Sequence, residues 1–203
     1  MNKNRLEALT DGVFAIVVTL LVLDIRLPEG TTMANLGNNF IHVLPSLATY
    51  VLSFMIIGLY WIFHLSASRM FKEVDYRVVW LNIILVMAVG LLPFTTSILS
   101  EFTASPWAPA VYGVNILAIN LAGWFVMVYL YHHQSLAKDK FTPQMFVAQR
   151  NQYIKIASLY AVGIVLAFVA PLVSVFIYGF VTLYLILGTI FPKLTWRRTF
   201  NIK

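Results

Sequence analysis

Six apolar stretches, each long enough to cross a lipid bilayer, limit what this chain can fold into. They cover approximately residues 6–27, 43–66, 77–99, 110–132, 151–170 and 172–191. A membrane-spanning helix needs about 20 predominantly apolar residues. We therefore expect an all-α, polytopic membrane protein in which residues 1–203 form a single domain of six transmembrane helices.

The composition indicates that the surrounding solvent is lipid. Hydrophobic residues make up 60% of the chain and charged residues 11%, whereas a soluble domain has about 25% charged residues. The mean hydropathy is +0.82. The chain has no cysteine, which excludes disulfides, thiolate metal sites and thiol catalysis.

Two details of the apolar stretches affect the number of spans. Residues 151–191 would form one helix of about 60 Å at 1.5 Å per residue, far longer than a bilayer is thick. We expect a tight hairpin at Pro171 that divides this stretch into two spans. The first stretch contains Asp11 and lacks a small-residue cleavage site, so we expect it to be retained as a span.

The basic residues orient the chain. With six spans, Arg26 alone of the 14 Lys and Arg residues falls on the second side of the membrane. By the positive-inside rule, the side that carries the others is cytoplasmic. We expect a multi-pass protein of the inner (plasma) membrane with both termini in the cytoplasm. The net charge of +6 then reflects topology and lipid contact, and we expect no nucleic-acid partner.

Polar residues inside the spans gather in one layer near the cytoplasmic face. Charged groups in a membrane are costly and need partners. We therefore predict a buried hydrogen-bonded network with a structural role, whose members are Arg5, Thr10, Asp11, Trp61, His64 and Asn82. No second mid-membrane acid and no Ser or metal triad accompanies His64, so we expect neither enzyme activity nor a cofactor.

The first span also carries an uncharged stripe. At 100° per residue, Ile16, Thr19 and Leu23 share one surface, and Leu20 lies at its edge. Asp11 lies well off this stripe and should point at a neighbouring helix. The pattern alone leaves two interpretations open, plain helix packing or the lining of a pore. The Thr19 hydroxyl has a further alternative, because it can bond to a carbonyl of its own helix.

A motif in the first span resembles that of a known family. The segment Arg5-x-x-x-Leu9-Thr10-Asp11-Gly12-Val13-Phe14-Ala15-Ile16 is similar to the signature Arg-x-x-x-Phe-Ser-Asp-Gly-Val-Phe-Ala-Ile. That signature belongs to the bacterial relatives of the endosomal and lysosomal potassium channel. Leu9 replaces the aromatic residue, and Thr10 keeps the hydroxyl. Supporting matches are Trp61-x-x-His64, Asn82, Leu91-Leu92-Pro93-Phe94-Thr95 and Tyr112-x-x-Asn115.

The resemblance, which rests on the first four spans, implies a channel that conducts potassium ions. It implies a homotetramer in which the first helix of each subunit lines the pore. Carried over by position, the apolar constriction falls on Ile16, Leu20 and Leu23, and Thr19 is a polar pore residue. No metal other than the permeating potassium is expected. A secondary transporter or a non-conducting membrane scaffold remains the alternative.

Overall fold

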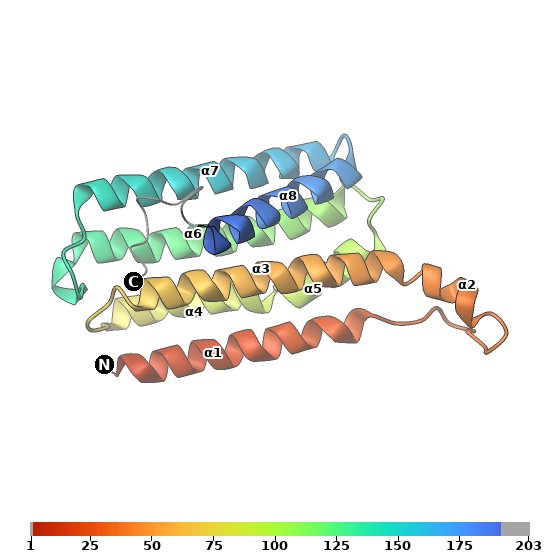
Figure 1. The fold of residues 1–203 in the computed structure, drawn as a ribbon, viewed down its shortest axis with the longest axis horizontal. Helices are drawn as coiled ribbons and strands as arrows, with labels where there is room; N and C mark the ends of the chain where they lie inside the picture. Colours follow the sequence, from red (N-terminus) through yellow and green to blue (C-terminus); the bar gives the residue numbers. More distant parts are fainter. Residues whose placement is uncertain (1, 192–203) are drawn as a thin grey trace.

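The computed structural model describes residues 2–191, and nearly all of this part of the chain is helical (Figure 1). Six long helical segments make up the bundle: α1 (Lys3–Leu20) with the 3-10 turn η1 (Leu21–Asp24), α3 (Leu44–Ser68), α4 (Tyr76–Gly90) with α5 (Leu92–Glu101), α6 (Trp107–His132), α7 (Pro143–Ala167) and α8 (Pro171–Ile190). The prediction of an all-α membrane protein with six such segments is confirmed. Residues 192–203 of the predicted domain lie outside the described part.

Two short helices connect longer ones and were not predicted. They are α2 (Leu36–Ile41), which precedes α3, and the 3-10 turn η2 (Gln134–Leu136), which precedes α7. α2 follows a polar stretch, and η2 directly follows the end of α6. Neither is long enough to cross a bilayer.

Five segments of the described chain are both long and apolar enough to span a membrane: Lys3–Asp24, Asn39–Ser68, Tyr76–Glu101, Trp107–His132 and Pro171–Ile190. The sixth, α7, has 25 residues but is less apolar. It begins at Pro143 rather than near residue 151, and its first half carries Gln149, Arg150 and Lys155. The polar first turns of α7 extend the helix beyond the predicted apolar span.

The third predicted span is broken inside the membrane. Between α4 and α5, Pro93 lacks the N–H that would continue the helical ladder, and Leu91 stands outside both helices. Asn115 of α6 compensates, because its Nδ2 donates to the Ala88 carbonyl oxygen at 2.9 Å. Its Oδ1 accepts from the Thr95 hydroxyl at 3.1 Å. A side chain of α6 therefore holds both sides of the break.

Two basic loops lie at the end of the bundle where α1 begins (Figure 1). The loop after α3 and the loop after α6 pair through their backbones. The Lys72 amide donates to the Leu136 carbonyl at 2.8 Å, and the Lys138 amide donates to the Met70 carbonyl at 2.8 Å. The segment that follows η1, which contains Arg26, lies at the other end.

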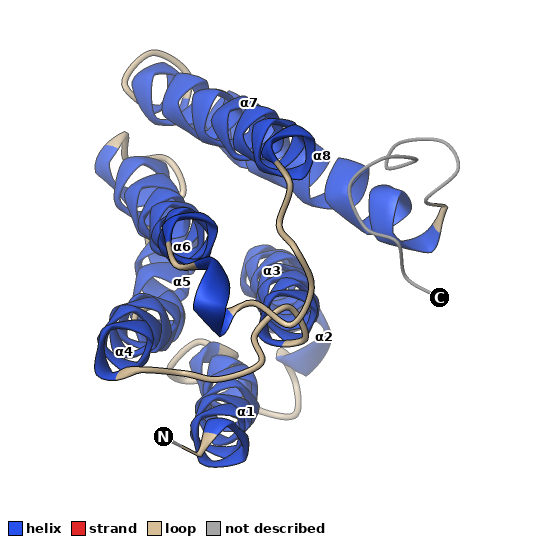
Figure 2. Ribbon diagram, turned by 90° about the vertical axis from the view of Figure 1, so that its left-hand side faces the viewer, coloured by secondary structure: helices blue, strands red, loops and turns tan. Residues whose placement is uncertain are grey.

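The core is built around α6, which contacts α4, α5, α7 and α8. Three fully buried tyrosines, Tyr112, Tyr160 and Tyr178, meet where α6, α7 and α8 converge. The ring centroids of Tyr178 lie 6.0 Å from Tyr112 and 5.9 Å from Tyr160. In contrast, α1 lies at the edge of the bundle, against α3, α4 and α5 (Figure 2).

Candidate functional site

The first helix has two faces with opposite surroundings. Its residues Phe14, Val17 and Leu21 are buried against the subunit. The apolar residues predicted to form the constriction are exposed by 61% at Ile16, 42% at Leu20 and 60% at Leu23. At 100° per residue the exposed stripe lies opposite the buried one. The predicted pore surface is therefore the surface that the subunit leaves uncovered.

Local sequence determines where this helix starts and stops. The Asn2 side chain caps the first turn by accepting from the Asn4 amide at 3.0 Å. The helix then runs without Pro to Leu20 and tightens into η1. Ile25 is extended, and Pro28 follows shortly afterwards. The exposed stripe thus ends where the chain leaves the helix.

Thr19 belongs to the exposed stripe. Its hydroxyl donates to the Ile16 carbonyl oxygen at 2.7 Å, as the backbone-bonding alternative predicted. A hydroxyl has one proton and two lone pairs. Since the proton is directed at the helix, the lone pairs of Oγ1 remain available on the exposed side, which suits a cation.

A buried chain of hydrogen bonds joins α1 to α3 and α4. Thr10 is fully buried; it donates to the Leu6 carbonyl at 2.9 Å and accepts from Asn82 Nδ2 at 2.7 Å. His64 Nε2 lies 2.9 Å from Asn82 Oδ1. Because that oxygen can only accept, Nε2 carries the proton. We call Thr10, Asn82 and His64 the α1 anchor.

A second contact joins α1 to α3 at the surface of the subunit. Trp61 Nε1 donates to Asp11 Oδ1 at 2.9 Å, and both residues are exposed. This pair flanks the exposed stripe. An exposed carboxylate at membrane depth is costly, which favours a further protein surface covering it.

The predicted network therefore appears as two groups, and Arg5 is in neither. Arg5 is exposed, and its guanidinium group makes no hydrogen bond or ion pair with another residue among 2–191. Its place in the network stays a prediction. At the start of α1 the described contacts come from Lys3 instead. Its Nζ donates to the Phe71 carbonyl at 3.0 Å and lies 3.5 Å from Glu7 Oε1.

Sequence reasoning missed a second polar group in the other half of the bundle. Ser53 Oγ lies 2.8 Å from Thr96 Oγ1 and 2.8 Å from the Tyr112 hydroxyl, all of them buried. These contacts tie α3 to α5 and α6. Tyr112 and the Thr95 region were noted as part of the resemblance, but a lone Ser in an apolar span gives no signal of its partners.

Comparison with known proteins identifies the family. A family model described as the endosomal/lysosomal potassium channel TMEM175 matches residues 5–93. A potassium channel of Streptomyces collinus is 35% identical over 193 residues, covering 91% of this chain and 92% of the relative. The chain belongs to the TMEM175 family. The predicted membership among its bacterial relatives is confirmed, and the family is one of ion channels rather than enzymes.

Other TMEM175 relatives extend the likeness over the last two spans. A potassium channel of Chryseobacterium sp. is 30% identical over 188 residues, and the match covers 90% of this chain and 92% of the relative. The crystal structure of a lysosomal potassium-selective channel TMEM175 homolog from Chamaesiphon minutus superposes with a TM-score of 0.81 at 27% identity, covering 92% of this chain and 97% of that one. The fold described here is thus that of a TMEM175 channel subunit.

Proposed function

We propose that this chain forms a homotetrameric potassium channel whose pore is lined by α1 of each subunit. One observation carries the proposal: the apolar stripe of Ile16, Leu20 and Leu23 faces away from the core of its own subunit. Relatives of similar length are named potassium channels. Four copies arranged about an axis would enclose these stripes together with the Asp11–Trp61 pairs.

The constriction would act by excluding water. Four Ile16 side chains form a dry ring, and an ion cannot pass until the ring widens enough to admit hydrated potassium. The Thr19 hydroxyls, with lone pairs free on the same surface, supply oxygen ligands to the partly hydrated ion. Asp24, Glu29 and Glu101 make the outer mouth attractive to cations.

The orientation follows from the charges at the two ends of the bundle. Both basic loops lie at the end where α1 begins, and the segment after η1 that contains Arg26 lies at the opposite end. The positive-inside rule therefore assigns the first end to the cytoplasm of a bacterial plasma membrane. The predicted cytoplasmic C-terminus lies outside the described residues. Arg5 is at the cytoplasmic end of the pore helix, where a neighbouring subunit would supply its partner.

The test of the constriction is potassium flux in liposomes. Ile16→Asn places a polar ring at the narrowest point, so water should enter and the flux should rise severalfold. Val162→Asn is the matched control, because Val162 is an exposed aliphatic residue of α7, which packs against α6 and α8. Equal flux in wild type and Ile16→Asn would refute the assignment of Ile16.

The same preparation separates a channel from the alternatives. A channel passes potassium down its gradient with no coupling ion and gives a reversal potential that follows the potassium gradient. A secondary transporter requires a second ion or substrate. A scaffold gives no flux above that of empty liposomes, and that result would refute the proposed function.

A further inference from the structure

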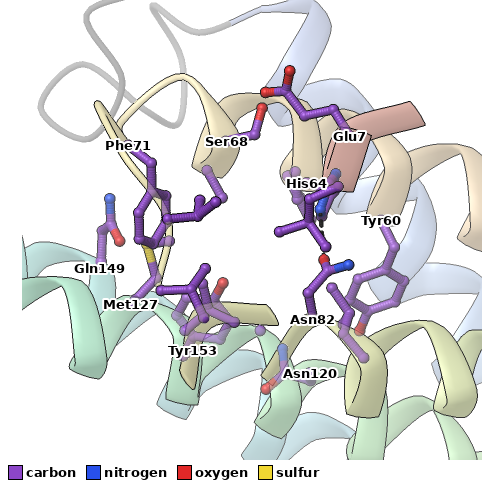
Figure 3. A pocket seen from close by; sticks show the side chains of 18 of the residues that line it. Glu7, Tyr60, His64, Ser68, Phe71, Asn82, Asn120, Met127, Gln149 and Tyr153 are labelled. Carbon is purple, nitrogen blue, oxygen red and sulfur yellow. Dashed lines mark hydrogen bonds between the residues drawn. The ribbon is translucent and has the colours of Figure 1, made fainter. Parts of the chain in front are cut away.

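A cavity of about 90 Å³ lies inside each subunit, at the end of the bundle where α1 begins (Figure 3). It is separate from the exposed stripe of α1. Residues of α1, α3, α4, α6 and α7 line it, including Tyr60, His64, Asn82, Asn120 and Gln152. The volume exceeds by several times the roughly 10–15 Å³ that one water molecule needs.

The deep end of this cavity carries polar atoms without partners. The Tyr60 hydroxyl, Asn120 Oδ1 and Gln152 Nε2 are buried and make no hydrogen bond among the described residues. Asn120 is 2% exposed. The Tyr60 hydroxyl lies near the side chains of Asn120 of α6 and Tyr160 of α7, but no hydrogen bond of good geometry joins it to either. Buried polar atoms of this kind normally have a partner, so these point to a guest in the cavity.

The rest of the wall determines the chemistry of that guest. It is mostly apolar, with Phe71, Val78, Leu85, Met127 and Ile156 among the lining residues. Water molecules can satisfy the three polar atoms, but against the apolar wall they would lack partners. A molecule with an apolar body and one hydroxyl satisfies both parts, since a hydroxyl donates and accepts.

Charged guests fit poorly. The charged side chains that line the cavity, Lys3 and Glu7, lie 3.5 Å from each other, and Lys3 also donates to the Phe71 carbonyl. Figure 3 places Glu7, Ser68 and Phe71 on one side of the cavity and Tyr60, Asn120 and Tyr153 on the opposite side. An ionised guest bound at the deep polar atoms would therefore lie away from Lys3 and Glu7 and would have no charged partner there.

We propose that the cavity is a binding site for a small uncharged alcohol, and that its occupancy modulates the pore helix. The connection runs through the α1 anchor, because His64 and Asn82 are part of the cavity wall while Asn82 donates to Thr10 of α1. A guest that packs against this wall favours the conformation in which the anchor is formed. The effect on conduction rests on the proposed function, whereas binding itself does not.

Binding is tested on the full chain in detergent with 4-fluoro-1-butanol, observed by fluorine NMR. Wild type should bind it saturably and should bind 1-fluorobutane, which lacks the hydroxyl, more weakly. Tyr60→Phe removes one hydrogen-bonding group and should weaken binding of the alcohol about fivefold. Ala67→Leu fills part of the cavity and should weaken it at least as much.

Ala118→Leu is the matched control, because Ala118 is an exposed residue of α6 that does not line the cavity. It should bind like wild type, and all variants should elute as wild type does from a sizing column. Absence of saturable binding to wild type, or equal binding to wild type, Tyr60→Phe and Ala67→Leu, would overturn the proposed site.

Flux then tests the coupling to α1. In liposomes the alcohol should change potassium flux with a midpoint at its dissociation constant, and Ala67→Leu should shift both together. Unchanged flux at saturating alcohol would refute the coupling. A wild type that binds the alcohol but passes no potassium would refute the channel function and leave the binding site standing.

Discussion

Asp11 and Thr10 are adjacent in sequence but serve different surfaces. Thr10 is buried between Leu6 and Asn82 within its own subunit, whereas Asp11 is exposed and meets Trp61. Successive residues of a helix point about 100° apart, so one short motif faces both the subunit core and its boundary. In the proposed tetramer, the motif would connect the packing of α1 to its contacts with other copies.

Asp11→Ala should reduce the fraction of assembled tetramer. The substitution removes the acceptor of the Trp61 bond, and hydrogen bonds to charged groups contribute about 1.5–3 kcal/mol. Assembly can be measured on a sizing column in mild detergent. Asp11→Asn keeps an oxygen for Trp61 and should assemble better than the alanine variant. Normal assembly with altered ion selectivity would instead make Asp11 a pore residue.

Residue depth could be predicted from the sequence, but pairing only in part. Placing Asp11, Trp61, His64 and Asn82 in one layer followed from the alternating direction of the spans. Which of them meet depends on the rotation of each helix, and the structure pairs Trp61 with Asp11 and His64 with Asn82. The unpartnered atoms of Asn120 and Gln152 have no sequence signature, because five helices must converge to create their cavity.

Among the helices, α6, α7 and α8 pack most closely where Tyr178 is buried. A Cβ at Gly113 of α6 or Gly163 of α7 would overlap the Tyr178 ring. The Tyr178 hydroxyl donates to the Pro109 carbonyl at 3.0 Å, so the ring is held in place. Glycine at these two positions is what allows the helices to approach.

Gly163→Ala should therefore destabilise the fold by about 1–3 kcal/mol, the usual effect of overpacking a core. Thermal unfolding of the detergent-solubilised protein, followed by tryptophan fluorescence, is the measurement. The control is Gly179→Ala on α8, where an added Cβ meets nothing within 4 Å. It should leave the unfolding temperature unchanged or slightly higher; similar losses in both variants would contradict the packing argument.

The cap at the start of α4 predicts that the stability of the fold depends on pH. Asp75 caps this helix through the Val78 amide at 2.9 Å and accepts from the Tyr129 hydroxyl at 2.6 Å. Burial raises the pKa of Asp75, but these hydrogen bonds outweigh it and hold the pKa below its ordinary value of 3.8. Because the pKa of Asp75 is lower in the folded state than in the unfolded state, its carboxylate stabilises the fold at pH values above the unfolded-state pKa. This stabilisation is lost as the pH falls through the folded-state pKa.

Asp75→Asn removes the charge and keeps the capping oxygen. Its unfolding temperature should lie below that of wild type at neutral pH, and the difference should shrink as the pH falls below 3.8. Glu73→Gln is the control, since Glu73 is an exposed neighbour whose ion pair with Lys72 is long at 3.9 Å. A difference that stays constant with pH would show that the Asp75 charge contributes nothing.

Helix existence was easier to predict than helix limits. Apolar length alone indicated six spans, because lipid requires such segments. It did not indicate the break near Leu91, since a proline inside an apolar run is compatible with either a kink or a break. It also did not indicate that α7 begins at Pro143, because Gln149 and Arg150 lower hydropathy without interrupting a helix.

On the scale of the whole molecule, the two ends of the bundle differ in charge. The absence of native cysteine makes the proposed orientation directly testable with single introduced cysteines. In intact cells, an impermeant maleimide should label Glu29→Cys but label Lys138→Cys only after the membrane is permeabilised. The reverse pattern would contradict the positive-inside assignment.

The edge position of α1 has a consequence for the fraction of subunits that assemble. This helix buries one face within its subunit, and its other face would be covered by other copies of the chain. Part of the free energy that orders it then depends on how many subunits share the same area of bilayer, as mass action requires. In the proposed tetramer, ordering of α1 and assembly of the pore would be a single equilibrium, set by subunit density.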